Sequence, residues 1–161
     1  MIKKITPNIH SIEFKEFGSI VYLVQIQKQN ILIDTSSKEN SSQLISSLKE
    51  LNLKPEDITT IILTHAHYDH IENIHLFPNA KIYSNKNINE FPLKEFNFYK
   101  TPGHTQEDII ILYNNVLFSG DVIFHEGYIG RTDFPESSPE KMQKSLEFIK
   151  TLKFEILCPG H

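Results

Sequence analysis

The sequence predicts a mixed α/β fold in which two β-sheets pack together with helices on the outside. Short apolar runs, which are typical of buried strands, occur between residues 20 and 158. Two amphipathic helical patterns lie among these runs. Strands from both ends of the chain alternate with helices, and this order of elements is typical of two packed sheets with helices on the outside. The 161 residues fit one domain over residues 1–161, large enough to bury about two-thirds of its unfolded surface.

The first half of the chain provides three strands and one helix. We expect a buried strand at residues 20–26 and its partner at residues 30–33, joined by a short polar turn. The turn-forming residues 34–37 end the second strand. Pro55 separates the following helix from a third strand at residues 61–63. The apolar face of that helix is predicted at Leu44, Ile45, Leu48 and Leu51.

The middle of the chain is predicted in less detail. A helix that begins near His70 is expected to end by Pro78, because proline does not continue a helix. Residues 81–83 are a candidate short strand, whereas residues 85–96 show no clear pattern. No sequence repeat or low-complexity linker divides the chain.

The last third predicts a hairpin, a helix and a final strand. Strands at residues 109–113 and 116–118 flank Asn114-Asn115, and Asn tolerates the positive φ of a tight turn. Ser138-Pro139 supplies a cap and a first-turn proline for the helix. A strand at residues 155–158 then leads to the final Pro-Gly-His. The helix has its apolar face at Met142, Leu146, Ile149 and Leu152.

Composition argues against several kinds of partner. The net charge is −4, and no run of Lys and Arg is longer than two residues. Such a chain offers neither a basic nucleic-acid groove nor a surface for anionic membranes, and no apolar stretch approaches a membrane span. Cys158 is the only cysteine, so the fold has no internal disulfide. We therefore expect a soluble cytoplasmic protein that acts on a small molecule.

A dense cluster of metal-binding side chains follows the third strand. His65, His67, Asp69 and His70 fall within six residues. In an extended strand residues i and i+2 point to the same side, so His65 and His67 can converge on one ion. Asp69 alone would more often cap a helix, but three imidazoles and a carboxylate at this spacing favour a metal site. Such ligands suit Zn²⁺, with iron and manganese as competitors.

Three further segments each place one potential ligand after a strand and a sharp turn. His104 follows Pro102-Gly103, Asp121 follows Gly120, and His161 follows Pro159-Gly160. Glycine and proline at these positions let the backbone turn tightly and expose the next side chain. With the first cluster, these segments supply five histidines and two aspartates, an inventory that suits two adjacent ions.

Together, these motifs resemble the ordered motifs of the metallo-β-lactamase superfamily. Residues 30–35 and the Gly-Arg-Thr-Asp-Phe stretch at 130–134 resemble glyoxalase II-like hydrolases within it. The resemblance extends from about residue 22 to residue 161. It implies a four-layer αββα sandwich, here without the usual C-terminal helical extension, with two metal ions at one edge of the sheets.

The resemblance also implies a role for each ligand. His65, His67 and His104 would hold the first ion, and Asp69, His70 and His161 the second, with Asp121 bridging the two. Asp34 would support the site from behind the ligands, as outer carboxylates commonly do. Arg131 and Asp133 are expected to pair and order their loop rather than to take part in the chemistry.

This sequence departs from the family pattern in ways that matter to the site. Ser36 stands where the family often has glycine, and Glu72-Asn73 replaces a usual pair of small residues. The family also usually continues with a helix beyond the final Pro-Gly-His. A homo-oligomer, in which a partner subunit covers the surface that this helix would otherwise cover, therefore remains an alternative.

The predicted reaction is hydrolysis by a hydroxide that bridges the two metals, because bound metal lowers the pKa of water from about 15.7 to about 7. The expected substrate is a thioester such as an S-acylglutathione-like compound. Asp69 and Asp121 are the expected catalytic carboxylates. Glyoxalase II itself grips glutathione with a C-terminal region for which this chain has no room, which leaves the substrate open.

Two other functions are compatible with the same motifs. Persulfide dioxygenases share the Gly-Arg-Thr-Asp-Phe stretch and use one Fe²⁺, here held by His65, His104 and Asp121. His161 favours a two-metal hydrolase instead, because it completes the second site. The other alternative is a metal-binding domain with little catalytic activity.

Overall fold

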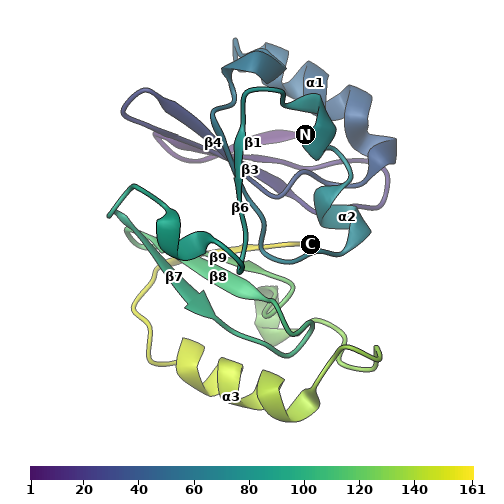
Figure 1. Cartoon of the computed structure of the whole chain (residues 1–161), viewed down its shortest axis with the longest axis vertical. Coiled ribbons are helices and arrows are strands. Elements are labelled where there is room, and N and C mark those ends of the chain that lie inside the picture. Colours follow the sequence, from purple (N-terminus) through teal and green to yellow (C-terminus); the bar gives the residue numbers. More distant parts are fainter. The chain divides into compact units, whose positions relative to one another are not determined.

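The computed structural model describes all residues, 1–161, and the chain divides into two compact units. Unit 1 is Met1–Tyr83 and unit 2 is Ser84–His161. Each unit contains one β-sheet and helices of its own, and the strands and helices are labelled in Figure 1. The expectation of a single domain over residues 1–161 stays a prediction.

Unit 1 is built on a six-stranded sheet with the order β1-β2-β3-β4-β5-β6. The first four strands pair antiparallel, whereas β5 and β6 continue the sheet in parallel. Parallel neighbours need a crossover, and the helix α1 (Ser41–Glu50) lies in the connection from β4 to β5. The strands are β1 (Ile2–Thr6), β2 (Ile9–Ile12), β3 (Val21–Ile26), β4 (Gln29–Ile33), β5 (Thr60–Ile62) and β6 (Lys81–Tyr83).

Helix α1 packs on one face of this sheet. Its buried side chains Leu44 and Leu48 join a core that includes Leu23, Leu32 and Ile61 from three neighbouring strands. Their spacing of four residues puts both leucines on the same side of the helix. Ile45, which the sequence predicts on this face, is instead 39% exposed. The apolar stripe of α1 is therefore narrower than predicted.

Unit 2 has a four-stranded sheet with the order β10-β9-β8-β7, in which only β9 and β10 are parallel. Helix α3 (Pro139–Ile149) lies in the connection between those two strands and covers one face of the sheet (Figure 1). The side chain of Ser138 accepts a hydrogen bond from the Lys141 N–H and caps α3, as predicted. The strands are β7 (Phe96–Lys100), β8 (Ile109–Tyr113), β9 (Val116–Gly120) and β10 (Ile156–Pro159).

The core of unit 2 lies between α3 and its sheet. Met142 and Ile149 of α3 pack with Ile110 and Leu117 of the central strands, and all four side chains are buried. The β8–β9 hairpin turns at Asn114, whose φ of 54° confirms the predicted use of an asparagine at positive φ.

The structure differs from the predicted elements in three places. Strands β1, β2 and β7 were not predicted. Strand β5 ends at Ile62, so His65 and His67 lie in the loop beyond the strand rather than on it. Helix α2 (Tyr68–Ile71) starts two residues earlier than expected and is a single turn. The short 3₁₀ helices are η1 (Lys38–Asn40), η2 (Pro55–Asp57), η3 (Ile74–Leu76), η4 (Ile88–Glu90) and η5 (His125–Gly127).

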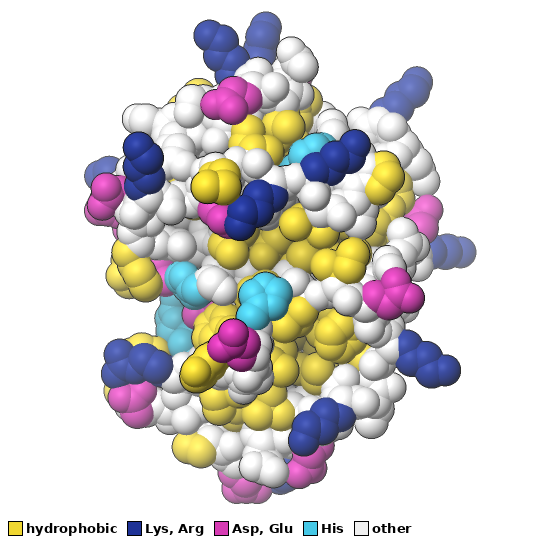
Figure 2. Space-filling model, turned by 180° about the vertical axis from the view of Figure 1, so that it is seen from behind, with side chains coloured by type: hydrophobic (Ala, Val, Ile, Leu, Met, Phe, Trp, Pro, Cys, Tyr) yellow, Lys and Arg dark blue, Asp and Glu magenta, His cyan; other side chains and the backbone are white.

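The surface and helix lengths bear on possible partners. On the face seen in Figure 2, the Lys and Arg side chains are dispersed among acidic ones and do not form a continuous basic patch. None of the helices has both the length and the apolar character that crossing a bilayer would require.

Candidate metal centre

The first group of candidate ligands lies in unit 1, between the end of β5 and helix α2. The backbone N–H of Thr64 donates to Asp34 Oδ1 at 2.8 Å, in the segment that leaves β5. The next turn is α2, with His67 as its N-cap residue in an extended conformation. This local path, rather than the alternation of a strand, sets the directions of the histidine side chains.

Within unit 1 the four predicted ligands come together. The ring centroids of His65 and His67 are 4.7 Å apart, and those of His65 and His70 are 4.1 Å apart. The potential ligand atoms of Asp69 and His70 lie within 4.8 Å of each other. His65, Asp69 and His70 are buried. Three imidazoles and one carboxylate are thus gathered at one end of the sheet of unit 1.

Asp34 supports this group, as the sequence predicts. Its carboxylate oxygen Oδ2 lies 2.8 Å from His70 Nδ1 and accepts a hydrogen bond from the Thr64 hydroxyl at 2.7 Å. Because an ionised carboxylate only accepts, His70 carries its proton on Nδ1, and Nε2 is the ring nitrogen that would bind an ion. The Asp34 side chain is only 3% exposed, so this contact is made away from bulk water.

The turn that carries Asp34 explains two departures from the family pattern. Asp34 and Ser36 both have a positive φ, 58° and 64° respectively, which is where a glycine would be favoured. The Asn73 amide, fully buried, donates to the carbonyls of Thr35 at 2.8 Å and Ser37 at 2.7 Å. The larger side chain at residue 73 therefore holds the turn in its left-handed conformation.

The second group of ligands lies in unit 2, where two strands end side by side. Strand β9 ends at Gly120, whose φ is 50°, and Asp121 follows. Strand β10 runs parallel to β9, and the Gly160 N–H donates to the Gly120 carbonyl at 2.8 Å. The carboxyl ends of parallel strands meet at one sheet edge, which brings His161 next to Asp121.

The spacing around Asp121 is that of ligands rather than of hydrogen-bonded partners. Asp121 Oδ2 lies 3.5 Å from His104 Nε2 and 3.6 Å from His161 Nε2. Both separations exceed the usual 2.7–3.2 Å of an N–H···O bond. Two ligand atoms about 2.1 Å from one tetrahedral ion are about 3.4 Å apart. One carboxylate oxygen thus stands at ligand spacing from two imidazoles.

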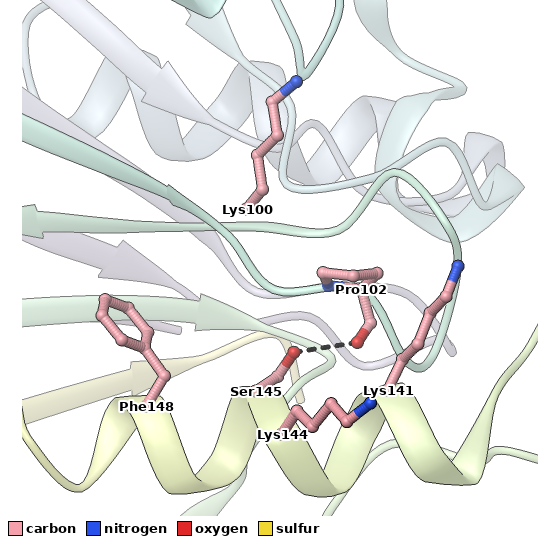
Figure 3. Close-up of a pocket in the computed structure, with 6 residues that line it drawn as sticks. All are labelled: Lys100, Pro102, Lys141, Lys144, Ser145 and Phe148. Carbon is pink, nitrogen blue, oxygen red and sulfur yellow. Dashed lines mark hydrogen bonds between the residues drawn. The ribbon is translucent and has the colours of Figure 1, made fainter.

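The turn that presents His104 is held from two sides. Figure 3 shows a surface pocket of about 380 Å³ between β7, this turn and α3, in which Ser145 of α3 donates to the Pro102 carbonyl at 2.8 Å. On the other side, Asp108 accepts from the Thr105 N–H and hydroxyl at 2.7 and 2.6 Å. Burial raises the pKa of Asp108, and these hydrogen bonds partly offset the rise.

Several contacts to His104 were not predicted from the sequence. His104 Nδ1 lies 2.8 Å from the backbone carbonyl of Arg131, and Ser137 donates to the His104 carbonyl at 2.6 Å. Arg131 also pairs with Asp133 at 2.7 Å, as predicted. A hydrogen bond from Arg131 lowers the pKa of Asp133. A backbone carbonyl leaves no residue-type signal in a sequence, so only the structure identifies it as a partner of His104.

Each unit thus assembles a coherent part of the predicted ligand set. Unit 1 brings together four of the seven residues, and unit 2 brings together the other three. Neutral imidazole and carboxylate are the donors preferred by Zn²⁺ and accepted by iron and manganese. The chemistry of the donors therefore fits the predicted metals.

Comparison with known sequences identifies the family. The family model for the metallo-beta-lactamase superfamily matches residues 15–90 and 84–161. A "Probable metallo-hydrolase" of Methanocaldococcus jannaschii is 42% identical over 101 residues, which cover 56% of this chain and 50% of the relative. "Hydroxyacylglutathione hydrolase 1" of Vibrio vulnificus is 31% identical over 82% of this chain and 57% of its own length. This chain therefore spans about half to three-fifths of these relatives.

Comparison with solved structures confirms the predicted fold. TTHA1623, crystallised in a di-iron-bound form, matches with a TM-score of 0.75 at 22% identity, over 94% of this chain and 91% of its own. ETHE1 from Myxococcus xanthus matches with a TM-score of 0.74 at 24% identity, over 95% of this chain and 75% of its own. From its motifs, its fold and the match to nearly its whole length, this chain belongs to the metallo-β-lactamase superfamily.

Proposed function

We propose that this protein is a hydrolase that depends on two divalent metal ions, with zinc as the expected metal. The observation that carries the proposal is Asp121 Oδ2, which stands 3.5 and 3.6 Å from the Nε2 atoms of two histidines. An oxygen at ligand spacing from two imidazoles suits a carboxylate shared by two ions. In this assignment His65, His67 and His104 would hold the first ion, Asp69, His70 and His161 would hold the second, and Asp121 would be shared by both.

The residues of the chain prepare both groups of ligands for metal binding. When bound, the ions supply a nucleophilic water of lowered pKa and a Lewis acid for a carbonyl oxygen. Asp34 fixes the proton of His70 on Nδ1, and the Arg131 carbonyl does the same for His104. Both imidazoles are thereby held in the tautomer whose Nε2 lone pair can bind an ion.

The two acidic ligands would have different roles in catalysis. Asp121 is assigned to both ions, whose combined charge would make it a very weak base. Asp69 binds a single ion in this assignment and is therefore the better acceptor for a proton released during hydrolysis. We assign proton transfer to Asp69 and the positioning of the two ions to Asp121.

We propose a thioester as the substrate, in the class of S-acylglutathione-like compounds. The support comes from the relatives named hydroxyacylglutathione hydrolase, which are 31% and 29% identical over 82% and 96% of this chain. Hydrolysis of a thioester needs an activated water and a polarised carbonyl, and a two-metal site can provide both. This chain spans 57% and 65% of the length of those relatives.

The test is a metal-dependent thiol-release assay on the full chain. Metal-free protein and protein reloaded with two equivalents of zinc are incubated with an S-acylglutathione, and the released thiol is measured. We expect turnover only after reloading. An Asp121→Ala variant, treated in the same way, is expected to stay inactive because it lacks the shared carboxylate.

Two results would replace this proposal by another function. Purification with one equivalent of iron, together with oxygen uptake that depends on a persulfide, would identify a dioxygenase instead. Full occupancy by two ions without turnover of any thioester, ester or lactam would leave a metal-binding domain. A small-molecule substrate, a cytoplasmic location and a homo-oligomer stay predictions of the sequence.

A further inference from the structure

The loop at residues 130–134 packs directly against two of the proposed metal ligands. A Cβ atom added to Gly130 would lie 1.9 Å from the carbonyl oxygen of Asp121 and 3.1 Å from Nδ1 of His104. Real side chains do not approach a carbonyl so closely, so only glycine fits at this position without moving the loop. Gly130 is therefore packed closely against the backbone of Asp121 and the imidazole of His104.

The next residue of the loop, Arg131, sets which ring nitrogen of His104 carries the proton. The Arg131 carbonyl lies 2.8 Å from His104 Nδ1, and a carbonyl oxygen can only accept. The bond therefore requires a proton on Nδ1 and a lone pair on Nε2, the atom that stands 3.5 Å from Asp121 Oδ2. A histidine ligand needs this tautomer in order to bind an ion through Nε2.

The side chains of the loop hold its backbone in place. The guanidinium of Arg131 donates twice to the Asp133 carboxylate, through Nε at 2.9 Å and Nη2 at 2.7 Å. It also lies 4.6 Å from the ring centroid of Phe134, and that ring meets the His104 imidazole edge-on at 5.7 Å. The carbonyl and the ring thus contact two sides of one histidine.

We propose that Arg131, Asp133 and Phe134 are positioning residues that fix the tautomer and orientation of His104 through the shape of this loop. The inference rests on the proposed function, because His104 is a ligand only if the protein binds metal. The Arg131 and Asp133 side chains are 67% and 65% exposed, and an exposed ion pair contributes little to overall stability. The pair therefore acts on the geometry of the site and hardly on the folding equilibrium.

The test separates positioning from stability with three measurements on the full chain. Asp133→Asn removes the negative charge and one of the two acceptor oxygens of the bidentate pair, with hardly any change in the size of the side chain. We expect its zinc affinity, from competition with a chelator, to fall about 3- to 10-fold, somewhat less than the loss for a direct outer partner of a ligand. The melting temperature of the metal-free protein should stay that of the wild type.

The third measurement reads the tautomer of His104 directly. Long-range ¹H–¹⁵N spectra of the metal-free protein, recorded at about pH 8, should show wild-type His104 with its proton on Nδ1. Asp133→Asn should show a mixture of the two tautomers. Glu140→Gln is the matched control, because it breaks an equally exposed ion pair, with Lys144 at 2.7 Å in the same unit, that touches no ligand. It should change none of the three measurements.

The outcomes distinguish this inference from the proposed function. Wild-type zinc affinity and a pure Nδ1 tautomer in Asp133→Asn would overturn the inference and leave the hydrolase proposal intact. Failure of the wild type to bind zinc would overturn the hydrolase proposal, whereas the spectra of the metal-free protein would still test the loop. Gly130→Ala is expected to weaken zinc binding more than Asp133→Asn, since the new Cβ must displace the loop.

Discussion

The two groups of candidate ligands are oriented by different kinds of support. In unit 1, His70 is held by the carboxylate of Asp34, a buried side chain that also binds Thr64. In unit 2, His104 is held by a backbone carbonyl in a loop whose Arg131 and Asp133 side chains are exposed. A carboxylate is the stronger acceptor because its charge assists the hydrogen bond. The first support can be removed by one substitution, whereas the second can only be displaced.

This difference predicts how each half of the site responds to mutation. Loss of the Asp34 carboxylate would leave His70 without its charged partner, so the effect on metal binding should be large. Substitutions of side chains in the loop at residues 130–134 act on His104 only indirectly, so their effects on metal binding should be smaller.

Asp121→Ala should cause the largest loss, because it removes the carboxylate oxygen that stands beside two imidazoles. We expect zinc affinity to fall by more than about 100-fold, beyond the range for outer partners of ligands, together with the loss of hydrolysis. Elemental analysis after dialysis measures the first effect and thiol release the second. Retention of two tightly bound equivalents would show that Asp121 is not shared between ions.

Asp34→Asn should weaken zinc binding by about 10- to 100-fold. Asparagine tolerates the φ of 58° at this position, so the variant changes the charge and leaves the turn intact. Zinc titration against a chelator measures the effect. Thr64→Ser is the control, since it keeps the hydroxyl that donates to Asp34. Equal zinc affinities of Asp34→Asn and the control would show that the Asp34 carboxylate does not orient His70 for metal binding.

Asp133→Asn should have a smaller effect than Asp34→Asn when both are measured in the same titration. The expected ratio of their losses, several-fold, follows because one residue contacts a ligand directly and the other acts through Arg131. A greater loss in Asp133→Asn would reverse the comparison between the two units. It would show that the exposed loop, and not the buried carboxylate, dominates metal binding.

Core substitutions should change stability and leave metal affinity nearly unchanged. Leu48→Ala in unit 1 and Met142→Ala in unit 2 each remove a fully packed side chain, and each should lower the free energy of unfolding by about 2–5 kcal/mol. Urea unfolding of metal-free protein measures this. Ile45→Ala, at a position 39% exposed, is the control and should cost less than about 1 kcal/mol. If residues 1–161 form one domain, both core variants shift a single transition.

Local sequence signals predicted most of the strands and helices because their apolar periodicity is clear. Strands β1, β2 and β7 were not predicted. Most side chains of β1 and β7 are partly or fully exposed, and β1 carries Lys3 and Lys4, so pairing within the sheets rather than apolar periodicity defines these two strands. The assignment of His65 to a strand was wrong because Asp34, thirty residues earlier, binds the backbone of Thr64 just beyond the end of β5. Such long-range contacts leave no local pattern.

The candidate ligands were predictable for a different reason. Metal binding needs particular residue types, and histidine and aspartate next to glycine turns stand out in any sequence. Of the groups that orient the ligands, some could be predicted from the sequence and others only from the structure. Asp34 could be predicted as a carboxylate at the end of a strand, whereas the Arg131 carbonyl and the tight packing of Gly130 depend on where the loop folds back.

The most direct measurement of the central claim is the zinc stoichiometry of the wild-type chain. Metal-free protein is titrated with zinc, freed of unbound metal and analysed for zinc per chain. The account predicts two tightly bound equivalents in the wild type and fewer than two in Asp121→Ala. A wild-type chain that retains no zinc would contradict it.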